Sequence, residues 1–273
     1  SGFNAEVSGN VPAGAGLSSS AAFEVATAGF LMALNGIHLE PMEVARLCQR
    51  AENEFVGVRS GLLDQATAVF GRANHLVHLD FQTEEIRTIP FPAKLALVIA
   101  DSGAKHNLLR SQYNARREEC VAAAEALGVA SLREVTPARL SDARGSLDPV
   151  LYRRAAHIVG EIDRVAQAVE ALQNGNSALI GELMDASHES SRTNFENSTA
   201  ELDLLVEIAQ SLPGVFGARL TGGGFGGGTV TLVQASAAGE VARQIGAQYT
   251  HRSGHSPATF VCRVADGAAV TWR

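Results

Sequence analysis

The sequence predicts an α+β protein with two domains. Helix-like and strand-like stretches alternate along the 273 residues without the regular period of a doubly wound sheet. A chain of this length can bury one large core or two modest ones. Phe91, Pro92 and Ala93 separate two strand-like runs, so we expect an N-terminal domain over residues 1–92 and a C-terminal domain over residues 93–273.

The N-terminal half contains two amphipathic helical patterns. The first covers residues 21–34, where apolar residues recur at helical spacing before an Asn-Gly stop signal. The second covers residues 41–55; Pro41 is suited to the first helical position and Gly57 ends the pattern. The other expected elements are a strand at 3–7, a short helix at 62–70, and strands at 75–81 and 85–91.

The C-terminal half opens with the apolar run LALVIA at residues 95–100, which predicts a buried strand. A helical pattern over residues 108–127 follows and stops at Gly128. The remaining expected elements are helices at 149–173, 178–193, 201–212 and 239–248, and strands at 229–233 and 259–264.

Composition excludes several classes of function. A net charge of −7 without a basic run argues against a nucleic-acid partner, and no apolar stretch approaches membrane-spanning length. There is no signal-peptide pattern, and Cys48, Cys120 and Cys262 are predicted to be reduced, buried thiols of a cytoplasmic protein. The histidines lack metal-ligand spacing and are predicted to be structural. Because the chain starts without Met inside a strand-like run, we expect that further sequence precedes Ser1.

The run PAGAGLSSSAA at residues 12–22 feeds small residues and hydroxyls into the first helix. Such a loop directs unpaired backbone N–H groups and the positive end of the helix dipole at one point, which is how proteins hold phosphate. A serine there could also face a metal ion. The alternative is a turn whose serines only cap the helix. The spacing matches neither the Walker lysine pattern nor the dinucleotide fingerprint.

Two acidic residues are candidates for chemistry. Asp64 is expected just inside a helix start, where the helix dipole favours the ionised carboxylate. Glu52 lies near the end of the preceding helix, so the two could converge on one pocket, one binding Mg²⁺ and one facing a substrate hydroxyl. The alternatives are a first-turn aspartate without a chemical role, and a solvated face formed by Glu52 and Glu54.

A second glycine-rich stretch contains six glycines among residues 222–228 and is interrupted by Phe225. Apolar strand residues flank it, which favours close approach of backbone to a ligand or another loop over a freely flexible segment. Tyr113 and Arg116 lie in an amphipathic helix, where the sequence does not separate them from ordinary surface residues.

Taken together, five ordered segments resemble the GHMP small-molecule kinases, and most closely the galactokinase branch of that family. They are residues 12–22, 51–65 (AENEFVGVRSGLLDQ), 101–120 (DSGAKHNLLRSQYNARREEC), 154–165 (RAAHIVGEIDRV) and 217–233 (GARLTGGGFGGGTVTLV). The resemblance implies an N-terminal domain similar to ribosomal S5 domain 2 and a ferredoxin-like C-terminal domain.

The resemblance also implies roles for individual residues. Asp64 corresponds to the catalytic aspartate, Ser20 and Glu52 to Mg²⁺ ligands, and Gly61 and Tyr113, with Asp64, to substrate-binding positions in the sugar pocket. The loop around the ATP phosphates corresponds to Pro12, Gly14, Ala15, Gly16, Leu17, Ser18, Ser19 and Ser20. The third family motif, which packs against that loop, corresponds to Gly222, Gly223, Gly224 and Gly226.

The implied reaction is transfer of the γ-phosphate of ATP to a sugar hydroxyl, with O1 of galactose as the acceptor and with Mg²⁺. The chain departs from the family pattern in lacking a GEHTDYN-like motif, in having Arg59 and Ser60 in place of a proline and a frequent cysteine, and in having Gly228 in place of a common cysteine. Alternatives are another sugar, an amino sugar or a mevalonate-type alcohol, and a sugar-sensing relative with little activity. The oligomeric state, monomer or weak dimer, stays open.

Overall fold

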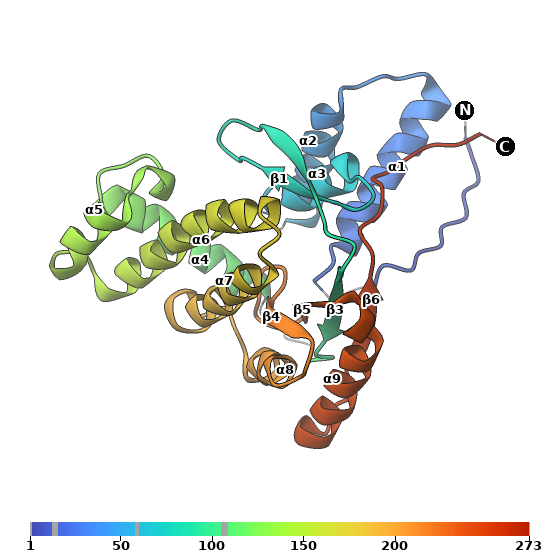
Figure 1. Ribbon diagram of the computed structural model, residues 1–273. Helices are drawn as coiled ribbons and strands as arrows, with labels where there is room; N and C mark the ends of the chain where they lie inside the picture. The colour runs from blue at the N-terminus through green and yellow to red at the C-terminus, as the bar shows by residue number, and fades with distance from the viewer. Residues whose placement is uncertain (1, 13–15, 58–59, 105–108, 273) are drawn as a thin grey trace.

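The structure, a computed structural model, describes residues 2–12, 16–57, 60–104 and 109–272 (Figure 1). It is an α+β fold, as predicted. A two-stranded hairpin and three helices form the N-terminal part, and a four-stranded sheet with its covering helices forms the C-terminal part.

The predicted N-terminal helices are present. Helix α1 covers Ser19–Asn35 and ends at Gly36 in the left-handed conformation (φ +64°), while α3 covers Leu63–Phe70. Helix α2, Pro41–Ala51, begins with Pro41 and a capping box between Glu40 and Glu43. Strands β1 (His75–Leu79) and β2 (Ile86–Pro90) pair antiparallel.

The second predicted helix changes its winding before it ends. After Ala51 the chain continues as one π-helical turn, Glu52–Val56, which Gly57 closes with φ +79°. Such a turn inserts an extra residue and shifts the direction of the side chains that follow it. The turn begins at Glu52, one of the two acidic residues singled out from the sequence.

The main sheet has the strand order β4-β5-β3-β6, and all neighbouring strands are antiparallel. Its strands are β3 (Leu95–Asp101), β4 (Val215–Leu220), β5 (Gly228–Gln234) and β6 (Ala258–Cys262). Alternate residues of one strand face opposite sides. Val233 therefore packs with α8 (Ala200–Gln210) and α9 (Ala238–Ser253), while Leu232 packs with α6 (Pro149–Gln173) and α7 (Ser177–Ser190).

Helices α4 (Leu109–Ala126), α5 (Pro137–Asp142) and α6 form a lobe beside the sheet, at the left of Figure 1. The lobe has its own buried cluster, which includes Ala123, Leu140 and Ala155. A further π-helical turn, Ser191–Phe195, follows α7 and ends at Glu196 with φ +53°.

The secondary structure differs from the prediction in one expected strand that is irregular and in two elements that were not expected. The strand expected at residues 3–7 is irregular, since no described strand pairs with it and its residues are exposed. Strand β4 was not predicted because Gly217 and Arg219 interrupt its apolar pattern. Gly217 is required there: a Cβ on it would collide with the backbone of Gly181 in α7. Helix α5 is too short to give a periodic signal.

The end of the chain returns to the N-terminal part. Gly267 N donates to Gly71 O at 2.8 Å, Ala268 N donates to Ala68 O at 2.8 Å, and the Asp266 carboxylate accepts from Ala73 N at 2.8 Å. The strand expected to reach residue 264 ends at Cys262, and the residues that follow it bond to the N-terminal part instead. The tail therefore crosses the domain boundary proposed at residues 92 and 93, and that division stays a prediction.

The remaining sequence predictions concern single residue types. Of the free cysteines, Cys48 is buried, whereas Cys120 and Cys262 are only half-buried, so the prediction of burial was wrong for two of them. His157 and His188 make structural contacts: the His157 ring accepts or donates at Ser190 Oγ, and His188 Nδ1 accepts from Leu220 N. No helix in the described ranges is long and apolar enough to cross a membrane.

Candidate functional site

The start of α1 carries the first glycine-serine stretch. Ser18 stands at the N-cap in the left-handed conformation (φ +54°), and its side chain makes no capping hydrogen bond. The capping alternative therefore does not explain this residue, and the first backbone N–H groups of α1 keep their capacity to bind an anion. Ala13, Gly14 and Ala15 lie outside the described residues. Pro12, Leu17 and Ser19 are partly buried.

Ser20 and Glu52 meet although they lie far apart in the chain. Ser20 Oγ donates a hydrogen bond of 3.0 Å to Glu52 Oε1. The second oxygen, Glu52 Oε2, accepts from Ser60 Oγ at 3.0 Å and from Gln65 Nε2 at 2.7 Å. The carboxylate is thus held at both oxygens, and it faces the first turn of α1.

Gln65 connects this carboxylate to a second one. It is fully buried, and its Nε2 donates both to Glu52 and, at 3.1 Å, to Glu24 Oε2. Burial raises the pKa of Glu24, and the negative charges of Glu52 and Asp64 add to the rise. Asp64 precedes Gln65 in the first turn of α3, as predicted, and is half-buried.

The two glycine-rich stretches lie against each other. Gly16 (φ +71°) is so close to the second stretch that a Cβ on it would lie 3.1 Å from Thr221 O. A Cβ on Gly222 would lie 3.4 Å from Gly16 Cα. Glycine is favoured at both positions because each has a φ of +71°, and a Cβ on Gly16 would in addition lie tightly against Thr221.

Tyr113 lies on the other side of the second stretch. A Cβ on Gly223 would come within 3.1 Å of Tyr113 Cδ2. Burial raises the pKa of the Tyr113 phenol, and the charge of Asp64 adds to the rise. Gly61 is exposed, and a Cβ on it would meet nothing within 4 Å, so the structure gives it no contact that requires glycine.

The donor set around Ser20 suits Mg²⁺. A hydroxyl and a carboxylate oxygen converge there, and Mg²⁺ binds oxygen ligands, usually one or two from protein with the rest from water and phosphates. In the described part of the chain, no three His, Cys, Asp or Glu side chains form a site that could hold a metal ion alone. Such a sparse set fits a metal ion that arrives with a nucleotide.

Comparison with known proteins finds similar sequences over nearly the whole chain. Residues 1–72 match the GHMP kinases N terminal domain and residues 168–251 match the GHMP kinases C terminal domain. Galactokinase from Bos taurus is 46% identical over 271 residues, which are 98% of this chain and 68% of the relative. Galactokinase from Homo sapiens is 44% identical over 270 residues, again 98% of this chain and 68% of the relative.

This chain belongs to the GHMP kinase family. A crystal structure of Lactococcus lactis galactokinase complexed with galactose superposes with a TM-score of 0.90 at 32% identity, covering 95% of this chain and 68% of the other. The resemblance inferred from five short segments is therefore confirmed. The roles of the individual residues within this GHMP kinase stay predictions.

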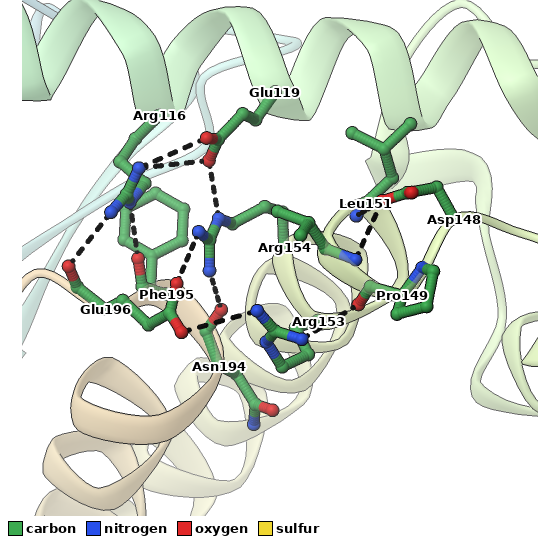
Figure 2. Close-up of polar contacts among 11 residues, drawn as sticks. Arg116, Glu119, Asp148, Pro149, Leu151, Arg153, Arg154, Asn194, Phe195 and Glu196 are labelled. Carbon is green, nitrogen blue, oxygen red and sulfur yellow. Dashed lines mark hydrogen bonds and ion pairs between the residues drawn. The ribbon is translucent and has the colours of Figure 1, made fainter.

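The helical pattern around Arg116 did not distinguish it from an ordinary surface residue, but in the structure of this kinase it makes several specific contacts. Its Nε donates to Phe195 O at 2.6 Å, its Nη2 donates to Glu196 O at 3.2 Å, and its guanidinium lies 5.7 Å from the centre of the Phe225 ring. Arg154 joins the same network, binding Glu119 at 2.5 Å and the Glu196 carboxylate at 2.6 Å (Figure 2). The network fixes α4, which carries Tyr113, to α6 and to the turn after α7.

Sequence reasoning missed several residues that shape the site. Gln65 and Ser60 lie inside a quoted segment, but their role as donors to Glu52 depends on how α1, α2 and α3 pack together. Glu24 is visible only as a polar residue within an apolar helix. Asn197 lies outside every motif, although its amide contacts the second glycine stretch.

Proposed function

We propose that this chain is the catalytic part of an ATP-dependent galactokinase that transfers the γ-phosphate of ATP to O1 of galactose. Membership of the GHMP kinase family supports the reaction class, and the galactokinases that it resembles over nearly its whole length support the sugar. The observation that carries the proposal is the meeting of Ser20 and Glu52 at the start of α1, with Asp64 beside the Gln65 that holds Glu52.

The start of α1 binds the phosphates of ATP in this proposal. The N–H groups of its first turn are not capped by Ser18, and no acidic side chain lies in that turn to repel an anion. Gly16 lets the chain approach Thr221 closely, which brings the second glycine stretch to the same place. Backbone donors held in this way stabilise the charge that develops on a transferring phosphoryl group.

Ser20 and Glu52 would hold Mg²⁺, whose positive charge would offset the negative charge of the phosphates. Gln65 and Ser60 keep the Glu52 carboxylate turned towards Ser20 by donating to its other oxygen. Both partners are uncharged, so they orient the carboxylate without neutralising its negative charge.

Asp64 orients the acceptor hydroxyl for in-line attack. Phosphoryl transfer depends mainly on positioning, so we assign Asp64 this role and leave open whether it also removes the proton. Tyr113 and Gly61 would contact the sugar. The substrate is a small sugar rather than a nucleic acid or a membrane, and the free cysteines favour a location in the cytoplasm.

Replacement of the aspartate tests the proposal. In the full-length protein, Asp64→Asn should lower galactose-dependent ATP turnover by about 10³-fold or more while ATP binding by calorimetry is unchanged. Asp163→Asn is the matched control, since Asp163 is exposed on α6 and bonded only to Gln167 in the described structure. Near-normal turnover of Asp64→Asn would contradict the assignment. Thermal stabilisation by galactose and ATP without any product in the unmodified protein would favour a sugar sensor instead.

A further inference from the structure

We propose that Asn197 is a positioning residue that fixes the second glycine stretch against both sides of the active site. The glycine loop, as we call residues 222–227, is held by this one residue at two points. The catalytic consequence rests on the proposed function, whereas the mechanical consequence does not.

The contacts of Asn197 enclose the middle of the glycine loop. Its backbone oxygen accepts from Phe225 N at 2.6 Å, and its Nδ2 donates to Gly223 O at 3.1 Å. Between these two bonds lies Gly224 (φ +77°), so close that a Cβ on it would collide with the carbonyl oxygen of Asn197. Asn197 is only 5% exposed, so water does not compete readily for these bonds.

The part of the glycine loop that Asn197 holds contacts both halves of the site. Gly222 lies against Gly16, next to the start of α1, and Gly223 lies against the ring of Tyr113. A shift of Gly223 would therefore disturb two contacts together: the one beside the start of α1, proposed to bind phosphate, and the one with Tyr113, proposed to bind the sugar. Shifts of about 1 Å in such positions are enough to lower a rate by about 10²-fold.

Asn197 is itself held from behind. Its N–H donates to Ser191 O at 3.1 Å, which closes the π-helical turn after α7. The carbonyls that precede it are bound by arginines: Asn194 O by Arg154 at 2.6 Å, and those of residues 195 and 196 by Arg116 (Figure 2). The segment is thus anchored to α4 and α6, and Asn197 transmits this anchorage to the glycine loop.

The side chain of Asn197 is not the one that stability alone would favour. Its Oδ1 is buried and has no hydrogen-bond partner among the described residues. A buried polar atom without a partner destabilises a fold, and an apolar side chain of similar size would avoid that cost. Leucine would fill the same space but could not donate to Gly223 O. Among the described residues, the asparagine side chain makes one hydrogen bond, from Nδ2 to Gly223 O of the glycine loop.

The test compares Asn197→Leu with the unmodified full-length protein. Amide hydrogen exchange, read peptide by peptide, should become faster in residues 222–227 and stay unchanged elsewhere, with Tm shifted by no more than about 4 °C. The kcat should fall about 10- to 100-fold with a smaller change in the KM for ATP, because the loop positions reacting groups rather than supplying binding area. Asn35→Leu is the control: Asn35 is exposed at the end of α1 and makes the same kind of bond, to Leu31 O at 2.8 Å.

Two results would overturn the inference. Unchanged exchange in residues 222–227 would show that Asn197 does not hold the loop, and faster exchange with unchanged kcat would show that holding it does not serve catalysis. If Asn197→Leu is globally destabilised, Asn197→Ala, which removes the donor without adding bulk or charge, decides the question; a general loss of protection in both variants means a merely structural residue. Should the unmodified protein lack kinase activity, the proposed function fails while the exchange experiment still tests the clamp.

Discussion

Two groups of charged residues differ in what their carboxylates meet. The acid cluster consists of Glu24, Glu52 and Asp64, and its described hydrogen bonds come from uncharged donors: Ser20, Ser60 and Gln65. The arginine network consists of Arg116, Glu119, Arg153, Arg154 and Glu196, in which every carboxylate meets a guanidinium. Their pKa values move accordingly: hydrogen bonding to Arg154 lowers the pKa of Glu196, whereas burial and neighbouring carboxylates raise that of Glu24.

We infer from this difference that the arginine network has a structural role and that the acid cluster has a role in binding. In the arginine network each carboxylate is neutralised by a guanidinium, and the ion pairs join α4, α6 and the turn after α7. Within the described residues the acid cluster has no ion pair, and its negative charge is oriented but not neutralised. Such an unneutralised cluster supports the proposal that a cation binds there together with the nucleotide.

The largest effect should come from removing charge at Glu52, the residue proposed to bind Mg²⁺. We expect Glu52→Gln to lower kcat by about 10²- to 10³-fold, because the amide keeps the shape and loses the charge that binds Mg²⁺. Titration calorimetry should show weaker Mg²⁺ binding in the presence of ATP, and raised Mg²⁺ should restore part of the activity. Glu54→Gln, in the same π-helical turn but exposed, is the control, and an equal loss there would contradict the special role of Glu52.

The next effect should come from breaking the arginine network. Arg154→Met removes a side chain that is 3% exposed and that donates to Glu119, Glu196 and Asn194 O, and it should lower the free energy of unfolding by about 2–3 kcal/mol. Urea denaturation followed by circular dichroism measures it. Arg243→Met removes an arginine from an exposed pair with Glu240 on α9 and should change stability little. Equal effects of the two substitutions would mean that burial does not strengthen the network.

The smallest effect should come from the amide between the acids. Gln65→Leu removes the donor shared by Glu24 and Glu52 and should lower the free energy of unfolding by about 1–2 kcal/mol at neutral pH. The pKa of Glu24 is already raised in the folded state, so protonation of Glu24 favours folding. The loss should therefore shrink as pH falls below the Glu24 pKa and grow as pH rises through it.

Denaturation of the Gln65→Leu variant at several pH values checks this dependence. Gln167→Leu serves for comparison, because Gln167 makes an exposed bond to Asp163 on α6. A Gln65 effect that is independent of pH would mean that repulsion between the two carboxylates is not its cause.

The sequence predicts well the features that depend on local pattern. The helices at residues 21–34 and 149–173, the buried strand at 95–100 and the place of Asp64 inside a helix start all follow from spacing, capping and glycine signals. What the pattern does not contain is the distance between elements. Ser20 and Glu52 meet because α1 and α2 pack together, which no window of the sequence shows.

The same reason explains the missed residues. A glutamine in a helix carries no signal of function by itself. The role of Gln65 follows only from its position between the carboxylates of Glu24 and Glu52, which come from other elements. Asn197 binds Gly223, a residue 26 positions away, after a π-helical turn that periodicity cannot predict. Strand β4 was not predicted because Gly217 interrupts its apolar pattern, and glycine stands there since α7 packs too closely for a side chain.

The hydrogen bonds between residues 264–268 and residues 68–74 have a consequence for the order of folding. The N-terminal part receives its last backbone partners from the opposite end of the chain, so these contacts have very high contact order. During synthesis, α1, α2 and α3 leave the ribosome long before the segment that completes them. Completion of this part is therefore a late step of folding, and a ribosome-bound chain stalled before residue 264 should show the first helices without their final protection from proteolysis.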